Sequence, residues 1–228
     1  MVVLRRADVV EGALELLDAD GLDGLTMRKL GAALNVQGGA LYRHFPSKEA
    51  LLDAMADRLL AGVGAPLPPD LPWLEQCREL AERLRAALLA RRDGARVVAG
   101  TFVPAPNTMA ATGRAIEILC AAGFPPDQAA WITFAVFYYV LGHTIEEQGQ
   151  ARLGPGEDWS TRLAAAQPPP AQLVASAMRA LATADPGQRF RFGLNLFLHG
   201  VARHLEELDG QRAAKPATAR RKRSRTPG

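Results

Sequence analysis

Three adjacent side chains, Tyr42, Arg43 and His44, are suited to hydrogen bonding with nucleic acid. A short helix is expected here, and its apolar residues Leu41 and Phe45 lie four positions apart, so both should face inward. The three polar side chains then point away from the core. A guanidinium binds guanine through two parallel hydrogen bonds, whereas a phenol and an imidazole suit phosphate oxygens. The set therefore predicts a surface that contacts DNA.

The elements on either side would position these residues. Thr26 is a good N-cap for a preceding helix, whose apolar residues recur at helical spacing. Asn35 ends that helix, because asparagine tolerates the left-handed conformation of a chain reversal. Ser47 caps a third helix, with Glu49 in its first turn where the helix dipole favours an anion. A helix that follows another after a tight turn fits the major groove of DNA.

The local charge agrees with this interpretation. The segment that contains Arg28, Lys29, Arg43 and Lys48 has no acidic residue, which suits contacts with phosphates. A helical hairpin with a solvated basic face would carry the same charge. Tyr42 could instead pack against the preceding helix, and His44 could be a histidine with a purely structural role. Arg43 is the expected base contact, with Arg28 and Gln37 also in reach. The residues expected at the DNA surface are Thr26, Arg28, Gln37, Gly39, Ala40, Tyr42, Arg43, His44 and Lys48.

Two segments carry a resemblance to a known family. Residues 21–30, GLDGLTMRKL, and residues 41–52, LYRHFPSKEALL, resemble the DNA-binding domain of the TetR family of transcriptional regulators. The second segment is the more specific, because aromatic, capping and acidic positions occur in fixed order. The match is good over residues 5–52. A weaker similarity, at residues 91–97 and 141–148, is to the tetracycline-repressor branch.

The resemblance implies roles within the DNA surface. Tyr42, His44 and Lys48 match family positions that contact phosphates. Residues 38–40 are Gly, Gly and Ala, where the tetracycline-repressor branch has side chains that read bases. This departure leaves fewer direct base contacts, so we expect an operator that differs from the tetracycline one.

Composition predicts an all-α protein. The chain has 228 residues, 48% of them hydrophobic but only 6% aromatic, and alternating β-branched runs are almost absent. No apolar run approaches the ~18 residues of a membrane span, so we expect a cytoplasmic protein that does not contact membranes. Cys77 and Cys120 are the only cysteines, and buried thiols are expected rather than a disulfide or a metal site.

The chain divides into four expected parts. Residues 1–63 form a three-helix helix-turn-helix DNA-binding domain with a connecting helix, and the Pro-rich residues 64–72 form a linker. Residues 73–208 form a helical effector-binding and dimerisation domain, interrupted by a Gly-, Pro- and Ala-rich loop at 151–170. Residues 209–228 are expected to be a disordered basic tail, because they are rich in Lys and Arg and poor in apolar residues. The first helix is expected to end near residue 20 and the last near residue 208.

The expected helix over residues 126–150 is apolar nearly all round, and such a helix is buried on several sides. A ligand pocket on one face and a second subunit on another would bury it, and the resemblance also implies a dimer built from four helices. The expected last helix carries a second apolar stripe, and intrachain core is the alternative for that stripe and for the helix over residues 126–150. The expected dimer-interface residues are Tyr139, Leu194, Phe197, Leu198, Val201 and Leu205.

A mainly apolar cavity between the middle helices is the expected effector site. Its expected residues are Val98, Thr101, Phe102, Met109, Thr112, Ile116, Trp131, Phe134, Phe137, Tyr138, His143 and Glu147. The family resemblance implies that Val98 replaces a histidine that binds the magnesium carried by tetracycline, while Glu147 matches the acidic position beside it. A lone carboxylate is a poor site for a hard cation, so we predict a metal-free apolar or aromatic effector and no cofactor.

These features predict a homodimeric, ligand-responsive repressor that binds a palindromic operator in double-stranded DNA. Two alternatives stay open. His143 and Glu146 share a helical face and would suit a metal, and an enzyme would use His143 with Glu147, although further ligands and catalytic motifs are not evident. The basic tail would instead suit an architectural DNA-binding protein without an effector, whose binding would depend on salt rather than on sequence.

Overall fold

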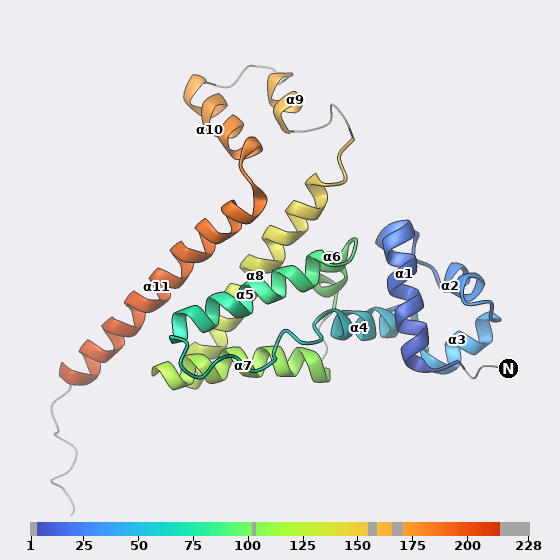
Figure 1. Cartoon of the computed structure of the whole chain (residues 1–228), viewed down its shortest axis with the longest axis horizontal. Coiled ribbons are helices and arrows are strands. Elements are labelled where there is room, and N and C mark those ends of the chain that lie inside the picture. The colour runs from blue at the N-terminus through green and yellow to red at the C-terminus, as the bar shows by residue number, and fades with distance from the viewer. Residues whose placement is uncertain (1–3, 102–103, 155–158, 166–170, 215–228) are drawn as a thin grey trace, which may run out of the picture.

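The computed structural model describes residues 4–101, 104–154, 159–165 and 171–214. Its elements are helices throughout these ranges, which confirms the expected all-α class (Figure 1). The helices are α1 (Arg6–Gly24), α2 (Met27–Ala33), α3 (Gly38–His44), α4 (Lys48–Leu59), α5 (Trp73–Leu89), α6 (Gly94–Ala99), α7 (Pro106–Ala122), α8 (Pro126–Gln150), α9 (Trp159–Ala164), α10 (Gln172–Thr183) and α11 (Pro186–Ala214). No helix among these described residues is long and apolar enough to cross a membrane.

Helices α1 to α3 form the first packed unit, as the apolar spacing predicts. The fully buried side chains include Leu17 of α1, Leu30 of α2, and both Leu41 and Phe45 at α3. The hydroxyl of Thr26 accepts a hydrogen bond from the backbone N–H of Lys29 at 3.2 Å, so the expected cap is confirmed. The turn between α2 and α3 begins at Asn35, which has the expected left-handed conformation with φ of 52°.

Helix α1 differs from the sequence prediction at its end. It extends to Gly24 rather than stopping near residue 20, but Gly21 interrupts it with a φ of 73°. Glycine adopts this left-handed conformation without the steric penalty of a side chain. The backbone N–H of Leu22, which the kink leaves free, donates to the Asp93 carboxylate at 2.9 Å. The glycine therefore bends the helix, and a residue from the second unit completes its hydrogen bonding.

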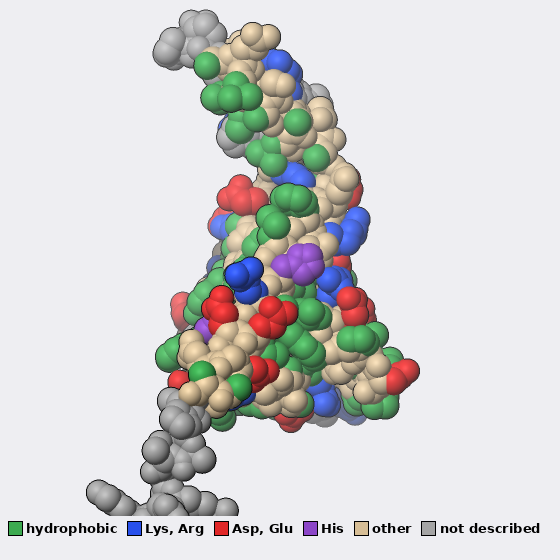
Figure 2. Space-filling view, turned by 90° about the vertical axis from the view of Figure 1, so that its left-hand side faces the viewer, with side chains coloured by type: hydrophobic (Ala, Val, Ile, Leu, Met, Phe, Trp, Pro, Cys, Tyr) green, Lys and Arg blue, Asp and Glu red, His purple; other side chains and the backbone are tan. Residues whose placement is uncertain are grey.

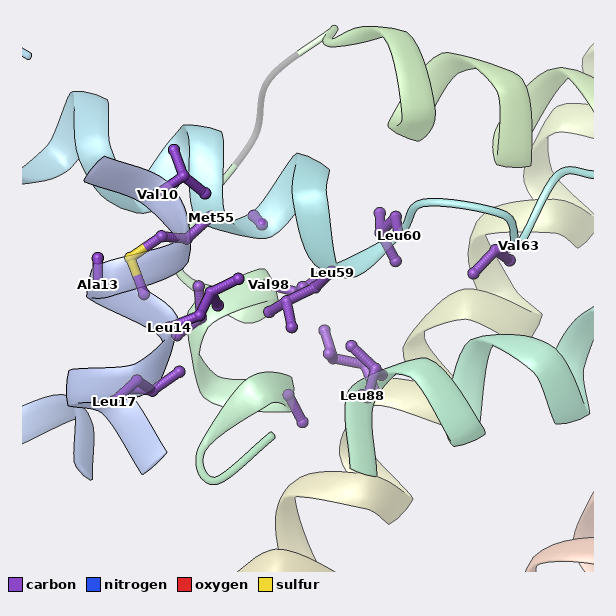
Figure 3. Packing of buried hydrophobic residues seen from close by; sticks show 14 of the residues in the cluster. Val10, Ala13, Leu14, Leu17, Met55, Leu59, Leu60, Val63, Leu88 and Val98 are labelled. Atoms are coloured by element: carbon purple, nitrogen blue, oxygen red, sulfur yellow. The ribbon is translucent and has the colours of Figure 1, made fainter. Parts of the chain in front are cut away.

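Helix α4 joins the two units through a continuous hydrophobic core. Met55 packs toward α1, while Leu59 lies between Val98 of α6 and Leu88 of α5 (Figure 3). Leu60 follows at the end of α4 and belongs to the same buried cluster. Burial on both sides of α4 means that a shift of this helix must repack both units.

Polar contacts reinforce this junction. Asp18 of α1 accepts hydrogen bonds from the Arg91 guanidinium at 2.5 Å and from the Arg92 backbone N–H at 2.9 Å. Arg96 of α6 pairs with Asp23 through two nitrogens, at 3.1 and 3.2 Å. The buried Asp93 carboxylate also accepts hydrogen bonds from Arg96 and Arg152. The end of α1 is therefore held against the α5–α6 turn.

The C-terminal helices contain two departures from expectation. Helix α11 continues to Ala214, beyond the expected end near residue 208, so the start of the expected tail is helical. Helix α9 lies inside the segment that was expected to be a loop. The rest of that segment at 155–158 and 166–170, and the tail at 215–228, lie outside the described residues. Helices α9 and α10 extend away from the body, and α10 buries no residue (Figure 1).

Candidate functional site

The first candidate site is the surface around α3. Tyr42 and Arg43 are exposed on this helix, whereas Leu41 between the turn and Tyr42 is buried. Thr26, Arg28, Gln37 and Gly39 are exposed as well, and Ala40, His44 and Lys48 are partly exposed. The structure therefore brings all nine predicted DNA-surface residues to one helix–turn–helix segment and the start of α4, with none in the core.

The helix is fixed from behind by Arg6 of α1. Its guanidinium donates to the carbonyl oxygen of His44 at 2.6 Å and lies 4.0 Å from the centre of the Phe45 ring. These contacts satisfy the C-terminal end of α3 without using the side chains of Tyr42 or Arg43. Arg6 is a positioning residue that sequence analysis missed, because its partner is a backbone carbonyl distant in sequence.

The basic residues of this surface are not equivalent. Lys29 forms an ion pair with Asp20 at 2.5 Å, so its charge is compensated within the chain. Arg28 and Arg43 form no ion pair with any described residue, and neither does Lys48. The positive charge available for phosphates or bases therefore comes from these three residues.

The second candidate site is a cavity of about 410 Å³ within the C-terminal helices. This volume is within the range of small-molecule pockets. Helices α4, α5, α6, α7, α8 and α11 contribute to its wall, and most of the side chains in the wall are apolar. The described lining residues are Asp53, Ala56, Leu60, Val63, Cys77, Leu80, Ala81, Leu84, Val98, Thr101, Pro104, Thr108, Met109, Ala111, Thr112, Ala115, Leu119, Ile132, Thr133, Phe134, Val136, Phe137 and Leu198.

Only some of the residues that were expected to line this cavity do so in the structure. Six of them do so: Val98, Thr101, Met109, Thr112, Phe134 and Phe137. Phe102 lies outside the described residues.

The remaining expected residues do not line it. Ile116 instead packs against a smaller apolar cluster around Leu119 and Phe124. Trp131 and Tyr138 are 68% and 61% exposed. They lie three and four positions from Phe134 on the same side of α8, but at the edge of that side that faces solvent. Periodicity identified the helix as apolar but did not distinguish its faces.

The contributions of α4 and α5 were missed by sequence analysis. Asp53 and Ala56 of α4 line the cavity, as do Cys77 and Leu80 of α5. Both helices show an ordinary amphipathic pattern, which does not distinguish core from cavity wall. Burial raises the pKa of the Cys77 thiol to about 12, so this side chain is a neutral part of the wall.

One wall of the cavity is anchored directly to α4. Asp57 accepts hydrogen bonds from the backbone N–H groups of Asn107 and Thr108, at 2.9 and 3.0 Å. The side chains of the same two residues also donate to it, at 2.9 and 3.3 Å. Helix α7 has no side-chain cap of its own at Ala105. Asp57 therefore caps α7 from another helix, beside the cavity-lining Thr108.

His143 and Glu147 do not line this cavity, and His143 instead lines a second hollow of about 390 Å³ together with Glu146. Arg85 donates to both carboxylate oxygens of Glu147, at 2.7 Å to Oε1 and 3.1 Å to Oε2. Burial lowers the pKa of His143, and the nearby Arg85 and Arg189 lower it further, against the opposing effect of Glu147. No group of three His, Cys, Asp or Glu side chains that would suit a metal occurs among the described residues.

The predicted dimer residues on α11 pack mostly within the single chain. Leu194, Leu198, Val201 and Leu205 are each less than 10% exposed within the single chain, and Phe197 packs against the α7 cluster. These residues form intrachain core, the alternative that the apolar stripe had left open. Periodicity shows that a face is apolar, not which neighbour covers it.

Tyr139 also belongs to this intrachain packing. Its hydroxyl donates to the carbonyl oxygen of Phe190 at 2.7 Å. The ring passes so close to Gly193 that a Cβ there would lie 2.4 Å from the hydroxyl oxygen. A side chain at this position would force the Tyr139 ring to shift, so Gly193 allows the close crossing of α8 and α11.

Other large apolar side chains of α8 and α11 are exposed. Trp131 and Tyr138 of α8 are exposed, and Phe192 and Leu196 of α11 are 68% and 61% exposed. Figure 2 shows the α11 side of the molecule, where hydrophobic side chains lie between charged ones. The upper part of this view also shows apolar side chains over the projecting α9–α10 segment. Exposed large apolar side chains in one region are typical of an interaction surface.

Two family models and a curated relative match this chain over most of its length. The family of bacterial regulatory proteins named tetR matches residues 9–55, and the tetracyclin repressor-like C-terminal domain matches residues 65–205. The chain is 38% identical to the tetracycline repressor protein class C of Escherichia coli over 202 residues, which are 87% of this chain and 90% of the relative.

Solved structures show the same similarity over nearly the whole chain. A possible TetR family transcriptional regulator from Streptomyces coelicolor A3(2) is 41% identical with a TM-score of 0.80, covering 87% of this chain and 99% of the other. A single-residue variant of TetR from Acinetobacter baumannii AYE, in complex with minocycline, is 37% identical with a TM-score of 0.67, at coverages of 88% and 97%. BioQ with its double-stranded DNA operator is 32% identical with a TM-score of 0.66, at coverages of 88% and 99%. The chain therefore belongs to the TetR family of bacterial regulatory proteins.

Proposed function

We propose that this protein is a homodimeric, sequence-specific DNA-binding repressor that a small molecule releases from its operator. The observation that carries the proposal is the dual position of α4. Lys48 at its start belongs to the predicted DNA surface, whereas Asp53 and Ala56 further along line the cavity. A ligand that favours a different position of α4 would therefore favour a different position of the DNA-binding unit.

The relatives support both halves of this proposal. BioQ was solved with its double-stranded DNA operator, which is similar in kind to the partner proposed here. The Acinetobacter baumannii TetR variant was solved with minocycline, a small molecule. Because the chain covers nearly all of each relative, the similarity includes both the DNA-binding unit and the cavity-forming helices.

The oligomeric state follows from geometry as well as from the family. A dimer places two recognition helices in successive major grooves, roughly 34–36 Å apart, and so requires a palindromic site. We propose the exposed apolar face of α8 and α11, with Trp131, Tyr138, Phe192 and Leu196, as the dimer surface in place of the buried residues predicted from sequence. Pairing of two helices from each subunit buries all four of these side chains.

We propose an apolar or aromatic effector that carries no metal. Val98 lines the cavity with an aliphatic side chain, and the Glu147 carboxylate is already bound by Arg85 outside the cavity. A hard divalent cation favours several oxygen ligands at one point, which this arrangement does not offer. Binding would depend on the buried apolar area and on the few polar groups of the wall.

The same contacts argue against the enzyme alternative. His143 and Glu147 were its candidate residues, but the Arg85 pair satisfies the carboxylate and burial favours neutral His143. We therefore propose a regulator without catalytic activity. An operator-binding protein acts where the DNA is, so we place it in the cytoplasm.

The proposal is tested by asking whether the cavity controls DNA release. Candidate apolar and aromatic compounds are screened for release of the protein from a DNA site selected from random sequences. Ala111→Trp fills the cavity and should abolish the response to every active compound, while DNA binding persists. Ala86→Trp, on an exposed position of α5 outside the cavity, is the matched control and should respond as the wild type does. Equal release from both variants would show that the effector binds elsewhere.

A further inference from the structure

One charged side chain faces the apolar cavity. Among the described lining residues, Asp53 of α4 is the only one with a formal charge, and none of the others is basic. Asp53 makes no hydrogen bond or ion pair with any described residue, unlike Asp57 one turn further along α4. A carboxylate at the edge of an apolar space, without a partner, is a site that favours a positive charge.

The other polar groups of the wall have the same preference. The hydroxyl of Thr101 donates its hydrogen to the carbonyl of Val98 at 3.0 Å, and that of Thr133 to the carbonyl of Ala129 at 2.8 Å. The hydroxyl of Thr108 donates to Asp57 at 3.3 Å. A hydroxyl whose hydrogen is used offers only its oxygen lone pairs.

The cavity therefore presents mainly hydrogen-bond acceptors. An ionised carboxylate accepts and does not donate, and the three hydroxyls described above are left as acceptors. Thr112 is one exception, because its hydroxyl has no partner among the described residues and can donate or accept. The neutral Cys77 thiol is another, but it is only a weak donor. A ligand with a carboxylate would place its charge beside Asp53 without a base to compensate it, whereas an ammonium group would find an opposite charge and several acceptors.

We infer that the effector is an apolar or aromatic molecule with a protonated amine, and that Asp53 is the residue that selects for this charge. The inference rests on the proposed function, in which this cavity holds the effector. It assigns the amine to the α4 wall and the apolar body to the wall formed by Phe134 and Phe137. A ligand held in this way contacts α4 directly, so its charge acts on the helix that carries the DNA-binding unit.

Three naphthalene probes of nearly equal size test the inference. They are 2-(1-naphthyl)ethylamine, which is cationic at neutral pH, 2-(1-naphthyl)ethanol, which is neutral, and 1-naphthylacetate, which is anionic. Their dissociation constants are measured by fluorescence titration or calorimetry on the full chain. A partly exposed ion pair with a charge-assisted hydrogen bond should favour the amine over the alcohol by about fivefold to tenfold in the wild type. The anion should bind most weakly.

The variant Asp53→Asn keeps the size of the side chain and removes its charge. It should bring the amine and the alcohol to within about twofold of each other, while the affinity for the alcohol stays the same and so reports an intact cavity. Glu49→Gln makes the same chemical change on an exposed position of α4 that does not line the cavity. It should keep the wild-type preference.

The outcomes separate this inference from the proposed function. If the alcohol binds but the wild type does not prefer the amine, or if Asp53→Asn keeps the preference, the inference is wrong and the apolar cavity remains. If none of the three probes binds, or if Ala111→Trp binds them as the wild type does, the effector cavity itself is wrong and the inference falls with it.

Discussion

Removing the Asp57 carboxylate should loosen the connection between α4 and α7. In Asp57→Ala, the backbone N–H groups of Asn107 and Thr108 lose the oxygen that accepts from both of them, and the Asn107 amide loses its partner. Helix α7 begins with Pro106 and has no local cap to replace it. The first turn of α7 should therefore fray and take Thr108 away from the cavity wall.

The expected fall in the free energy of unfolding follows from the number and kind of the hydrogen bonds that the substitution removes. Loss of a capping side chain costs about 0.5–2 kcal/mol, and an anion at a helix N-terminus contributes about 0.3–1 kcal/mol. Asp57 is partly exposed, so water compensates some of the loss. We expect the free energy of unfolding to fall by about 1–2 kcal/mol.

The assay is urea unfolding followed by circular dichroism, at one protein concentration because a dimer's stability depends on it. Asp70→Ala, at an exposed position between α4 and α5, removes a carboxylate without a described contact and is the control. It should change stability by no more than about 0.5 kcal/mol. Equal unfolding curves for the two variants would refute the assignment of Asp57 as the cap of α7.

Four further predictions concern DNA, pH and thiol reactivity. Arg43→Ala should weaken binding to the preferred DNA site by about 1–3 kcal/mol and relax the preference at one base pair. Lys48→Ala should weaken binding to all sequences alike. Unchanged site preference in Arg43→Ala would show that another surface recognises the bases. Residues 215–228 carry six Lys and Arg and no acid. Deleting them should reduce the slope of the logarithm of the DNA-binding constant against the logarithm of salt concentration, by about 0.9 for each phosphate that the tail neutralises. An unchanged slope would exclude binding of the tail to DNA. Because burial lowers the pKa of His143 from its ordinary value of 6.5, the unfolded state takes up the proton first. The free energy of unfolding should fall as the pH drops below about 6.5, and His143→Gln should lose part of that fall, measured by urea unfolding at several pH values. The Cys77 thiol, with its pKa raised to about 12, should react slowly with iodoacetamide at pH 8, followed by mass spectrometry; rapid alkylation would contradict its burial.

Local signals in the sequence predicted the DNA-binding unit well. Ser47 accepts a hydrogen bond from the Ala50 backbone N–H at 3.2 Å, as its position before Glu49 indicates. Asn35 adopts the left-handed turn, and Leu41 is buried while Tyr42 is exposed. Each of these features depends on neighbours within a few residues, so the order of residue types is enough to predict them.

The features that depend on distant neighbours were not predicted. Capping of α7 by Asp57 and closure of the α1 kink by Asp93 join residues far apart in sequence. The entry of Asp53 into the cavity wall likewise depends on how α4 lies against α6 and α7. An apolar stripe such as that of Leu194 and Leu198 indicates that this face of the helix is buried, but not which element covers it. Packing in three dimensions decided these points.

We expect this chain to read a specific DNA sequence as a dimer through α3. The most direct measurement is selection of bound fragments from random double-stranded DNA with the full chain, followed by sequencing. We expect enrichment of one palindromic site whose half-sites are about one helical turn apart. The Arg43→Ala variant should lose the preference at one base pair in each half-site. Enrichment of no sequence above the input, or of a single half-site without a palindrome, would contradict it.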